Sequence, residues 1–404
     1  MVVPHITFII ARMSFLQYIF WISCFLVFYN YAGYVIIVKI LNKLKKTPAS
    51  SAAKDEFFPT VSFIVAAYNE EDCISQKIVN SLQQDYPKDL VELIFITDGS
   101  TDGTAGLVSS YSSVKALHLP ERKGKSAAIN RAVRSARHEI LIFSDANTIL
   151  NKDAIRHIAR HYKNPSVGGV AGEKKVLSTP ASGHEVGDGE GLYWKYESYL
   201  KKTDSEFYSV VGAAGELFSC RTELYDAIPD NVILDDFICS MKVTQKGYRV
   251  IYEPEACAME LPSFSIGDEQ KRKVRIAAGG FQAIGMLTPL LAFWKYPRLS
   301  FLYISHRVLR WTLSPLCMIL AFITAGILSF VTDSLLFRLL FIAQLAFYGA
   351  ALAAALFPAI KERSKLAKLS YYFAFMNFSV VLGFFRFLRG RQAATWEKAR
   401  RATA

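Results

Sequence analysis

The sequence predicts an α/β domain that is inserted between membrane-spanning helices. Short β-rich runs alternate with helical segments from residue 60 to about residue 261, which is typical of a largely parallel sheet covered by helices. Long apolar runs lie on both sides of that region, and ~20 apolar residues are enough for a helix to cross a bilayer. The chain is therefore predicted to pass between a membrane and an aqueous compartment.

Four parts follow from this pattern: a transmembrane helix with a basic linker, the α/β domain, a set of interfacial helices, and further transmembrane helices with a basic tail. Their bounds are 1–54, 55–261, 262–312 and 313–404. The net charge is +12, and the Lys and Arg residues gather beside the apolar runs, where lipid headgroups and topology account for them. Membrane lipid is thus an expected partner. Nucleic acid is not, because no binding motif accompanies the charge.

The first apolar run covers residues 14–40 and is too long for a signal peptide. Five lysines follow it closely: Lys39, Lys43, Lys45, Lys46 and Lys54. Basic flanks face the cytosol, so the α/β domain is predicted to be cytosolic in a multi-pass protein of the cytoplasmic (cell) membrane. The Pro/Ala/Ser-rich stretch 47–53 is predicted to be a linker.

Three more apolar runs lie near the C-terminus, at 313–331, 335–357 and 369–388. If all of them cross, the basic tail ends outside the cell, against the positive-inside rule. We therefore expect the last run to lie in the interface or to re-enter, with a cytosolic tail. Ahead of these runs, His306 stands close to Arg307 and Arg310 and is expected to be an interface anchor.

Polar clusters follow three predicted strands at the point where each strand ends. The strands are 61–66, 91–97 and 139–144, and the clusters are 68–70, 98–102 and 145–148. In an open α/β sheet, ligands bind at the carboxyl ends of the strands. The three clusters are therefore expected to form one site.

Carboxylates in these positions suit sugar transfer from a nucleotide diphosphate. Such a reaction needs groups that hold the nucleotide, a cation with oxygen ligands for the diphosphate, and a carboxylate that deprotonates the acceptor hydroxyl. Asp98, Asp145 and Asp236 are the candidates. Each has an ordinary alternative as a turn residue or a helix N-cap, and only their common order favours a site.

Together, the motifs resemble those of the inverting family 2 glycosyltransferases, whose fold is the GT-A fold of nucleotide-diphospho-sugar transferases. Among these, the membrane-integrated enzymes similar to cellulose, hyaluronan and poly-N-acetylglucosamine synthases are the nearest in pattern. The resemblance covers residues 60–282 by motif, and the flanking helices by architecture. It implies a GT-A domain inserted between transmembrane helices.

The resemblance also implies roles for individual residues. Asp236 would be the catalytic base beside Asp235, with Gly247 eleven residues later. Asp145 and Asn147 would bind Mg²⁺ or Mn²⁺. Gly212, Gly215 and Ile276 would lie near the acceptor. The residues expected to bind the nucleotide sugar are Ala67, Tyr68, Glu70, Asp98, Lys125, Asp145, Arg272 and Arg275.

Asn147 and Ile276 depart from the family pattern. Asn147 replaces the second aspartate of the Asp-x-Asp motif, and an amide brings no charge, so the cation is expected to bind tightly only with the nucleotide. Ile276 replaces the tryptophan of Gln-x-x-Arg-Trp, while Arg272, Arg275, Gly279 and Gln282 keep the register. Without that aromatic platform, processive polymerisation becomes less favoured.

The implied function is inverting transfer from a UDP-sugar to a lipid-linked or growing polysaccharide acceptor at the cytosolic face. One alternative is a processive exopolysaccharide synthase with secretion, for which a homo-oligomer or a partner subunit would enlarge the channel. A second alternative is an inactive membrane scaffold that binds nucleotide sugars. Asn147 and Ile276 favour this alternative. The sequence names neither the sugar nor the acceptor.

Overall fold

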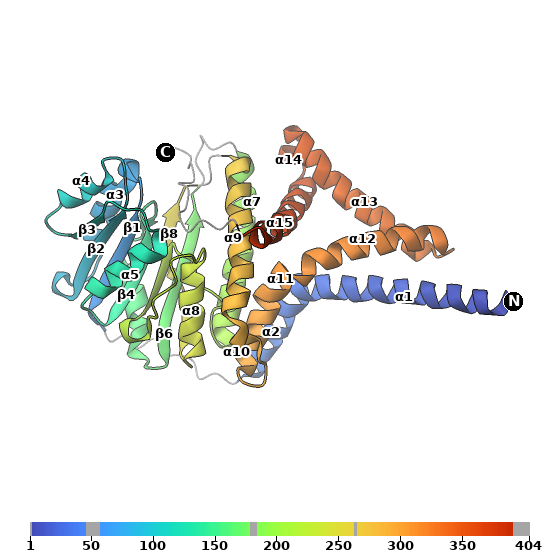
Figure 1. Ribbon diagram of the computed structural model, residues 1–404, viewed down its shortest axis with the longest axis horizontal. Coiled ribbons are helices and arrows are strands. Elements are labelled where there is room, and N and C mark those ends of the chain that lie inside the picture. The colour runs from blue at the N-terminus through green and yellow to red at the C-terminus, as the bar shows by residue number, and fades with distance from the viewer. Residues whose placement is uncertain (1, 46–56, 178–183, 262–264, 391–404) are drawn as a thin grey trace.

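The computed structural model describes residues 2–45, 57–177, 184–261 and 265–390 (Figure 1). The predicted linker 47–53 and most of the basic tail lie outside these ranges. A sheet with its covering helices forms one end of the molecule, and long apolar helices extend from the other end.

One eight-stranded sheet has the order β3-β2-β1-β4-β7-β6-β8-β5. β1, β2, β3 and β4 are parallel, whereas β7 runs antiparallel to both β4 and β6, and β5 runs antiparallel to β8. The sheet is thus mixed, with a parallel half that contains all three predicted strands. The bounds are β1 Val61–Ala67, β2 Val91–Asp98, β3 Lys115–Leu119, β4 Ile140–Asp145, β5 Ile149–Leu150, β6 Val167–Val176, β7 Leu217–Arg221 and β8 Arg249–Glu260.

Helices cover both faces of the sheet, which is why β1 is apolar at every position except Ser62. Phe63 and Val65 point to the face packed by α3 (Glu71–Leu82) and α6 (Ala154–Ala159). Ile64 and Ala66 point to the opposite face, packed by α5 and α8. The bounds of the remaining helices on the sheet are α4 Thr104–Ser109, α5 Lys125–Ser135 and α8 Asp235–Gln245.

Two long helices lie between the sheet and the apolar helices: α7 (His184–Phe207) and α9 (Ile266–Met286). The first apolar helix reaches them directly, because Asn42 on α2 (Tyr34–Leu44) donates a hydrogen bond to the Thr203 carbonyl on α7 (2.9 Å). The shorter helices are η1 Tyr29–Gly33, η2 Lys88–Leu90, η3 Arg160–Lys163, η4 Thr222–Leu224, η5 Thr288–Leu291, α10 Pro297–Tyr303, η6 Ile304–Val308, α11 Leu309–Trp311 and α14 Pro358–Arg363.

Within the described ranges, four helical segments are long and apolar enough to span a membrane, namely Met13–Leu44, Leu313–Val331, Leu335–Leu356 and Lys365–Leu388. α1 (Val2–Phe28) lies beside α12 (Leu313–Val331), while α13 (Leu335–Leu356) leads to α14 (Figure 1). α15 (Lys365–Leu388) then returns and packs along α9. The predicted apolar runs are therefore confirmed as helices. The interfacial position of the last run stays a prediction.

Candidate active site

A cavity of about 1470 Å³ lies between the carboxyl edge of the parallel strands and the membrane-side helices. Most of the residues predicted from the sequence line it, and they come from six different segments of the chain. These residues are Glu70, Lys125, Asp145, Asn147, Gly212, Gly215, Asp235, Asp236, Arg272, Arg275 and Ile276. Three predicted residues, Ala67, Tyr68 and Asp98, are not part of the lining.

Lys125 and Asp145 form an ion pair inside the cavity. Lys125 is the first residue of α5 and Asp145 the last of β4, and their Nζ and Oδ1 atoms are 2.7 Å apart. Burial disfavours the ammonium, but the negative charges of Asp145, Asp235 and Asp236 outweigh it and raise the Lys125 pKa. One carboxylate oxygen of the predicted cation site is thus bound by a lysine.

Asp98 lies beneath the loop that carries Lys125. Its carboxylate is 1% exposed and accepts hydrogen bonds from the backbone amides of Lys123 (3.0 Å) and Gly124 (2.6 Å). Its other oxygen accepts one from Arg131 (2.9 Å). Gly124 has a φ of +96°, a backbone conformation that glycine adopts without strain. Asp98 therefore fixes the shape of this loop from below.

A buried lysine on α3 supports the Asp145 turn. Lys77 is fully buried, and its ammonium donates to Ser144 Oγ (2.7 Å), the Thr148 carbonyl (2.9 Å) and Thr148 Oγ1 (3.2 Å). Burial lowers its pKa to about 7. All three donor positions are used, so Lys77 holds the turn between β4 and β5 in place. In the sequence it is one polar position of an ordinary amphipathic helix, so the prediction missed it.

Asp235 and Asp236 are the first two residues of α8. Burial and the neighbouring charge of Asp235 raise the pKa of Asp236 to about 7. A Cβ atom at Gly215 would lie 3.0 Å from Lys125 Nζ and 3.5 Å from Asp236 Oδ2, so the glycine loop passes directly beside both groups. A carboxylate with this pKa is suited to take a proton near neutral pH.

The segment that leads to Asp235 is held by α9. Gln282 accepts a hydrogen bond from the Ile233 amide (3.1 Å) and donates one to the Asn231 carbonyl (2.9 Å). A Cβ atom at Gly279 would come within 2.8 Å of Leu234, so only a glycine allows this close approach. Gly279 and Gln282, which match the family motif by their spacing in the sequence, thus position the predicted base Asp236.

The predicted cation ligands Asp145 and Asn147 both line the cavity. The described residues contain no cluster of three or more His, Cys, Asp or Glu side chains that would hold a metal ion alone. Asp145 offers one free carboxylate oxygen, and Asn147 an amide oxygen. These two residues fit a cation whose remaining ligands come from elsewhere, such as a nucleotide diphosphate.

The two arginines of α9 differ in their partners. Arg272 lies 3.7 Å from Glu216, 3.9 Å from Glu260 and 3.4 Å from Glu269. Arg275, one turn further, makes no hydrogen bond or ion pair in the part of the chain that the structure describes. Glu216 follows the predicted glycine loop 212–215 directly but was not among the predicted site residues. It also binds Lys174 (2.5 Å) and carries charge into the cavity lining.

Towards the membrane, aromatic side chains line the cavity. They come from η1, α7, α11 and α15: Tyr31, Tyr193, Trp194, Tyr196, Trp311, Tyr372 and Phe373. Such rings offer apolar faces that sugar rings or lipid chains can contact. No periodic pattern in the sequence indicates this set, because the helices that supply it are far apart in the chain.

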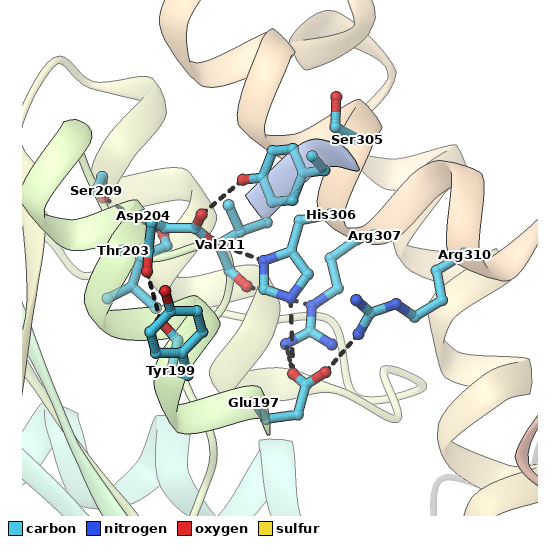
Figure 2. A network of polar contacts seen from close by, with 12 residues as sticks. Glu197, Tyr199, Thr203, Asp204, Ser209, Val211, Ser305, His306, Arg307 and Arg310 are labelled. Atoms are coloured by element: carbon cyan, nitrogen blue, oxygen red, sulfur yellow. Dashed lines mark hydrogen bonds and ion pairs between the residues drawn. The ribbon is translucent and has the colours of Figure 1, made fainter. Parts of the chain in front are cut away.

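A buried polar network joins α2, α7, η6 and α11 (Figure 2). Glu197 on α7 binds Arg307 (2.9 Å) and also Arg310. His306 contacts Asp204 (2.6 Å between Nδ1 and Oδ2), which accepts a hydrogen bond from Tyr34 (2.6 Å). The expectation that His306 is an interface anchor was wrong. The side chain is fully buried, because two carboxylates of α7 supply its polar partners.

The mixed sheet, with its cavity at the carboxyl edge of the parallel strands, has the arrangement of the GT-A fold. The chain carries a family 2 glycosyltransferase domain, since residues 62–228 match the family described as glycosyl transferase family 2.

Known proteins agree with this assignment. The chain is 28% identical over 235 residues to a poly-beta-1,6-N-acetyl-D-glucosamine synthase of Staphylococcus aureus (strain MSSA476), covering 55% of each protein. A Staphylococcus epidermidis protein of the same name is 28% identical over 242 residues, covering 58% of this chain and 56% of the relative. The matches thus span about half the length of these relatives. In fold, the chain is similar to the mannosyltransferase PcManGT from Pyrobaculum calidifontis, solved with GDP-Man and Mn²⁺. The TM-score is 0.69 at 22% identity, covering 92% of this chain and 99% of that one.

Proposed function

We propose that the protein transfers a sugar from a UDP-sugar, with inversion, to a lipid-linked or growing polysaccharide acceptor at the cytosolic membrane face. One observation carries the proposal. Asp236, whose pKa is raised to about 7, lines the same cavity as Lys125, Asp145 and Asn147. A proton acceptor and groups suited to a leaving diphosphate therefore face one space.

In this mechanism Asp236 removes the proton from the acceptor hydroxyl as that oxygen forms its bond to the anomeric carbon. The bond from this carbon to the diphosphate oxygen breaks at the same time, so the UDP leaves with the bonding electron pair. Lys125 and Arg275 offset the charge of the diphosphate. A Mg²⁺ or Mn²⁺ ion held by Asp145 and Asn147 would supply further positive charge to the leaving group.

The acceptor would occupy the membrane-side part of the cavity, where the aromatic rings gather. We propose a multi-pass protein of the cytoplasmic membrane, with the family 2 domain in the cytosol. Stepwise addition to a membrane acceptor is favoured by Ile276, which offers no aromatic platform. Processive exopolysaccharide synthesis, in a homo-oligomer or with a partner subunit, is the second candidate, and the names of the staphylococcal relatives favour it.

The test is a screen of UDP-sugars, with GDP-mannose as a comparison, for nucleoside diphosphate release in membranes that contain the full chain. UDP release that disappears in Asp236→Asn supports the proposal. Release from GDP-mannose alone contradicts the donor class. If no donor is turned over although UDP binds, the protein is an inactive scaffold. Product length in detergent separates single addition from processive synthesis.

A further inference from the structure

Two arginines from different helices face the cavity near its catalytic end. Arg275 lies on α9 and Arg386 on α15, and both line the cavity. The helices touch closely here, because a Cβ atom at Gly383 would lie 2.5 Å from Ala277 Cβ and 3.0 Å from the Val274 carbonyl oxygen. Arg386 is one helical turn beyond Gly383, on the same side of α15. The contact therefore fixes Arg386 close to the turn of α9 that carries Arg275.

Neither guanidinium has a bonded counter-charge. Among the described residues, no hydrogen bond or ion pair involves Arg275 or Arg386. The other arginines in the lining behave differently, since Arg307 and Arg310 bind Glu197. Burial lowers the pKa of Arg275, and the positive charge of Arg386 lowers it further. Two like charges held together in a shielded space are unfavourable unless an anion joins them.

We propose that Arg275 and Arg386 form a phosphate-binding pair, so that α15 completes the active site. The inference rests on the proposed function and deepens it. A guanidinium presents parallel N–H groups that match two oxygens of a phosphate, and two guanidiniums together suit a diphosphate. The ligand chemistry is a phosphate or diphosphate ester.

Two sources can supply that ester: the diphosphate of the donor, or the phosphate of a lipid-linked acceptor. Asp235 and Asp145 act electrostatically on Arg275, so the pair lies near the catalytic carboxylates, where the donor diphosphate would leave. A basic residue at the end of an apolar helix is usually explained by lipid headgroups. Arg389 fits that explanation, because it is exposed and does not line the cavity.

The experiment compares Arg386→Gln with Arg389→Gln, both in the full chain in lipid nanodiscs. The two variants remove the same charge from the C-terminal end of α15, where Arg389 is the residue that caps the helix, and only the first removes a cavity residue. Calorimetric titration with inorganic pyrophosphate and with UDP should show affinities weakened roughly tenfold to a hundredfold in Arg386→Gln, since a charged hydrogen-bonding group is lost. Arg389→Gln should match the parent chain. Uridine, which has no phosphate, should bind both variants equally.

Arg386→Lys provides a second variant if Arg386→Gln does not fold. This variant keeps the positive charge but loses the parallel N–H groups of the guanidinium, so weaker pyrophosphate binding is again expected. Unchanged pyrophosphate and UDP affinities with a raised KM for a phosphate-bearing lipid acceptor would assign the pair to the acceptor. The inference is overturned if the pyrophosphate affinity, the UDP affinity and the acceptor KM are all unchanged in the Arg386 variants. If the parent chain turns over no sugar nucleotide but Arg386→Gln still loses pyrophosphate, the proposed function fails and the phosphate-binding pair stands.

Discussion

Lys125 donates a hydrogen bond to Asp145 across 2.7 Å, at the carboxylate that the family resemblance assigns to a divalent cation. In the structure the ammonium neutralises the one charged ligand of that site, because Asn147 contributes only an amide. A cation entering the empty protein therefore competes with a lysine for Asp145. A bound diphosphate changes this balance, since it attracts Lys125 and offers oxygens to the metal.

We therefore expect Mn²⁺ to bind weakly to the empty protein and at least ten times more tightly in the presence of UDP, at about 1.4 kcal/mol per tenfold change. Asn147→Asp should strengthen binding to the empty protein, because it restores a second carboxylate. Lys125→Met should do the same by removing the competing charge, while lowering UDP affinity. Calorimetric titration measures the Mn²⁺ affinity of the parent chain and of both variants. Tight binding to the empty parent chain would contradict this account.

Replacement of the proposed base separates chemistry from binding. Asp236→Asn keeps the size of the side chain but cannot accept the hydroxyl proton, so transfer should fall by ~10²–10⁴-fold, the usual contribution of a general base. UDP affinity should change little. Asp235→Asn is the matched control on the neighbouring residue, and a smaller loss is expected there. Equal losses in both variants would count against the assignment of the base to Asp236.

The pH dependence follows from the same residue. The pKa of Asp236 is raised to about 7, so the carboxyl is protonated and inactive as a base below that pH and ionised above it. The value of kcat/KM should rise with pH and level off above about 7. Lys77 also has a pKa of about 7, so the profile of Lys77→Met serves as the control. If the inflection moved with Lys77→Met, it would belong to the lysine.

Much of the site was predictable because its signals are local in the chain. β1, β2 and β4 were predicted within about one residue at each end, since buried strands that end in polar turns have a strong pattern. The spacing from Asp236 to Gly247 also has a simple structural basis. α8 begins at Asp235 and ends at Gln245, and Gly247, with a φ of +95°, follows as the residue that ends the helix.

Other parts were not predictable because they depend on contacts between distant segments. Lys77 gains its role only when α3 packs beneath the β4 turn, and Asp98 points under the loop of Lys125 rather than into the cavity. In the sequence, membrane topology alone accounts for Arg386. Its position beside Arg275 becomes apparent only from the packing of α15 on α9. The local sequence pattern likewise does not indicate that β7 runs antiparallel to β4.

The contact between Gln282 and the segment before α8 predicts an effect on catalysis from outside the reacting groups. Gln282→Leu removes two hydrogen bonds to that segment, each contributing about 0.5–1.5 kcal/mol. Asp236 should then be held less firmly, and kcat should fall several-fold while the donor KM stays nearly constant. Steady-state kinetics measures both. A changed KM with a constant kcat would show that Gln282 acts on donor binding instead.

The buried network around Glu197 predicts a large effect on stability. Burial alone would raise the pKa of this carboxyl, but Arg307 and Arg310 hold it well below its usual range. Glu197→Gln leaves two buried guanidiniums without a counter-charge, and breaking a buried pair in this way costs about 3–5 kcal/mol. At an unfolding entropy of about 2.1 cal/mol/K per residue, the apparent Tm of this 404-residue chain in detergent should drop by roughly 4–6 °C.

Glu223→Gln is the matched control, because Glu223 is exposed on η4 and its substitution should leave Tm nearly unchanged. Glu197 joins α7 to the segment that precedes α12, so its loss should also loosen the family 2 domain from the membrane helices. Limited proteolysis should then cut Glu197→Gln between these parts faster than the parent chain. Equal Tm values for the two variants would mean that aromatic packing, not the ion network, holds this junction.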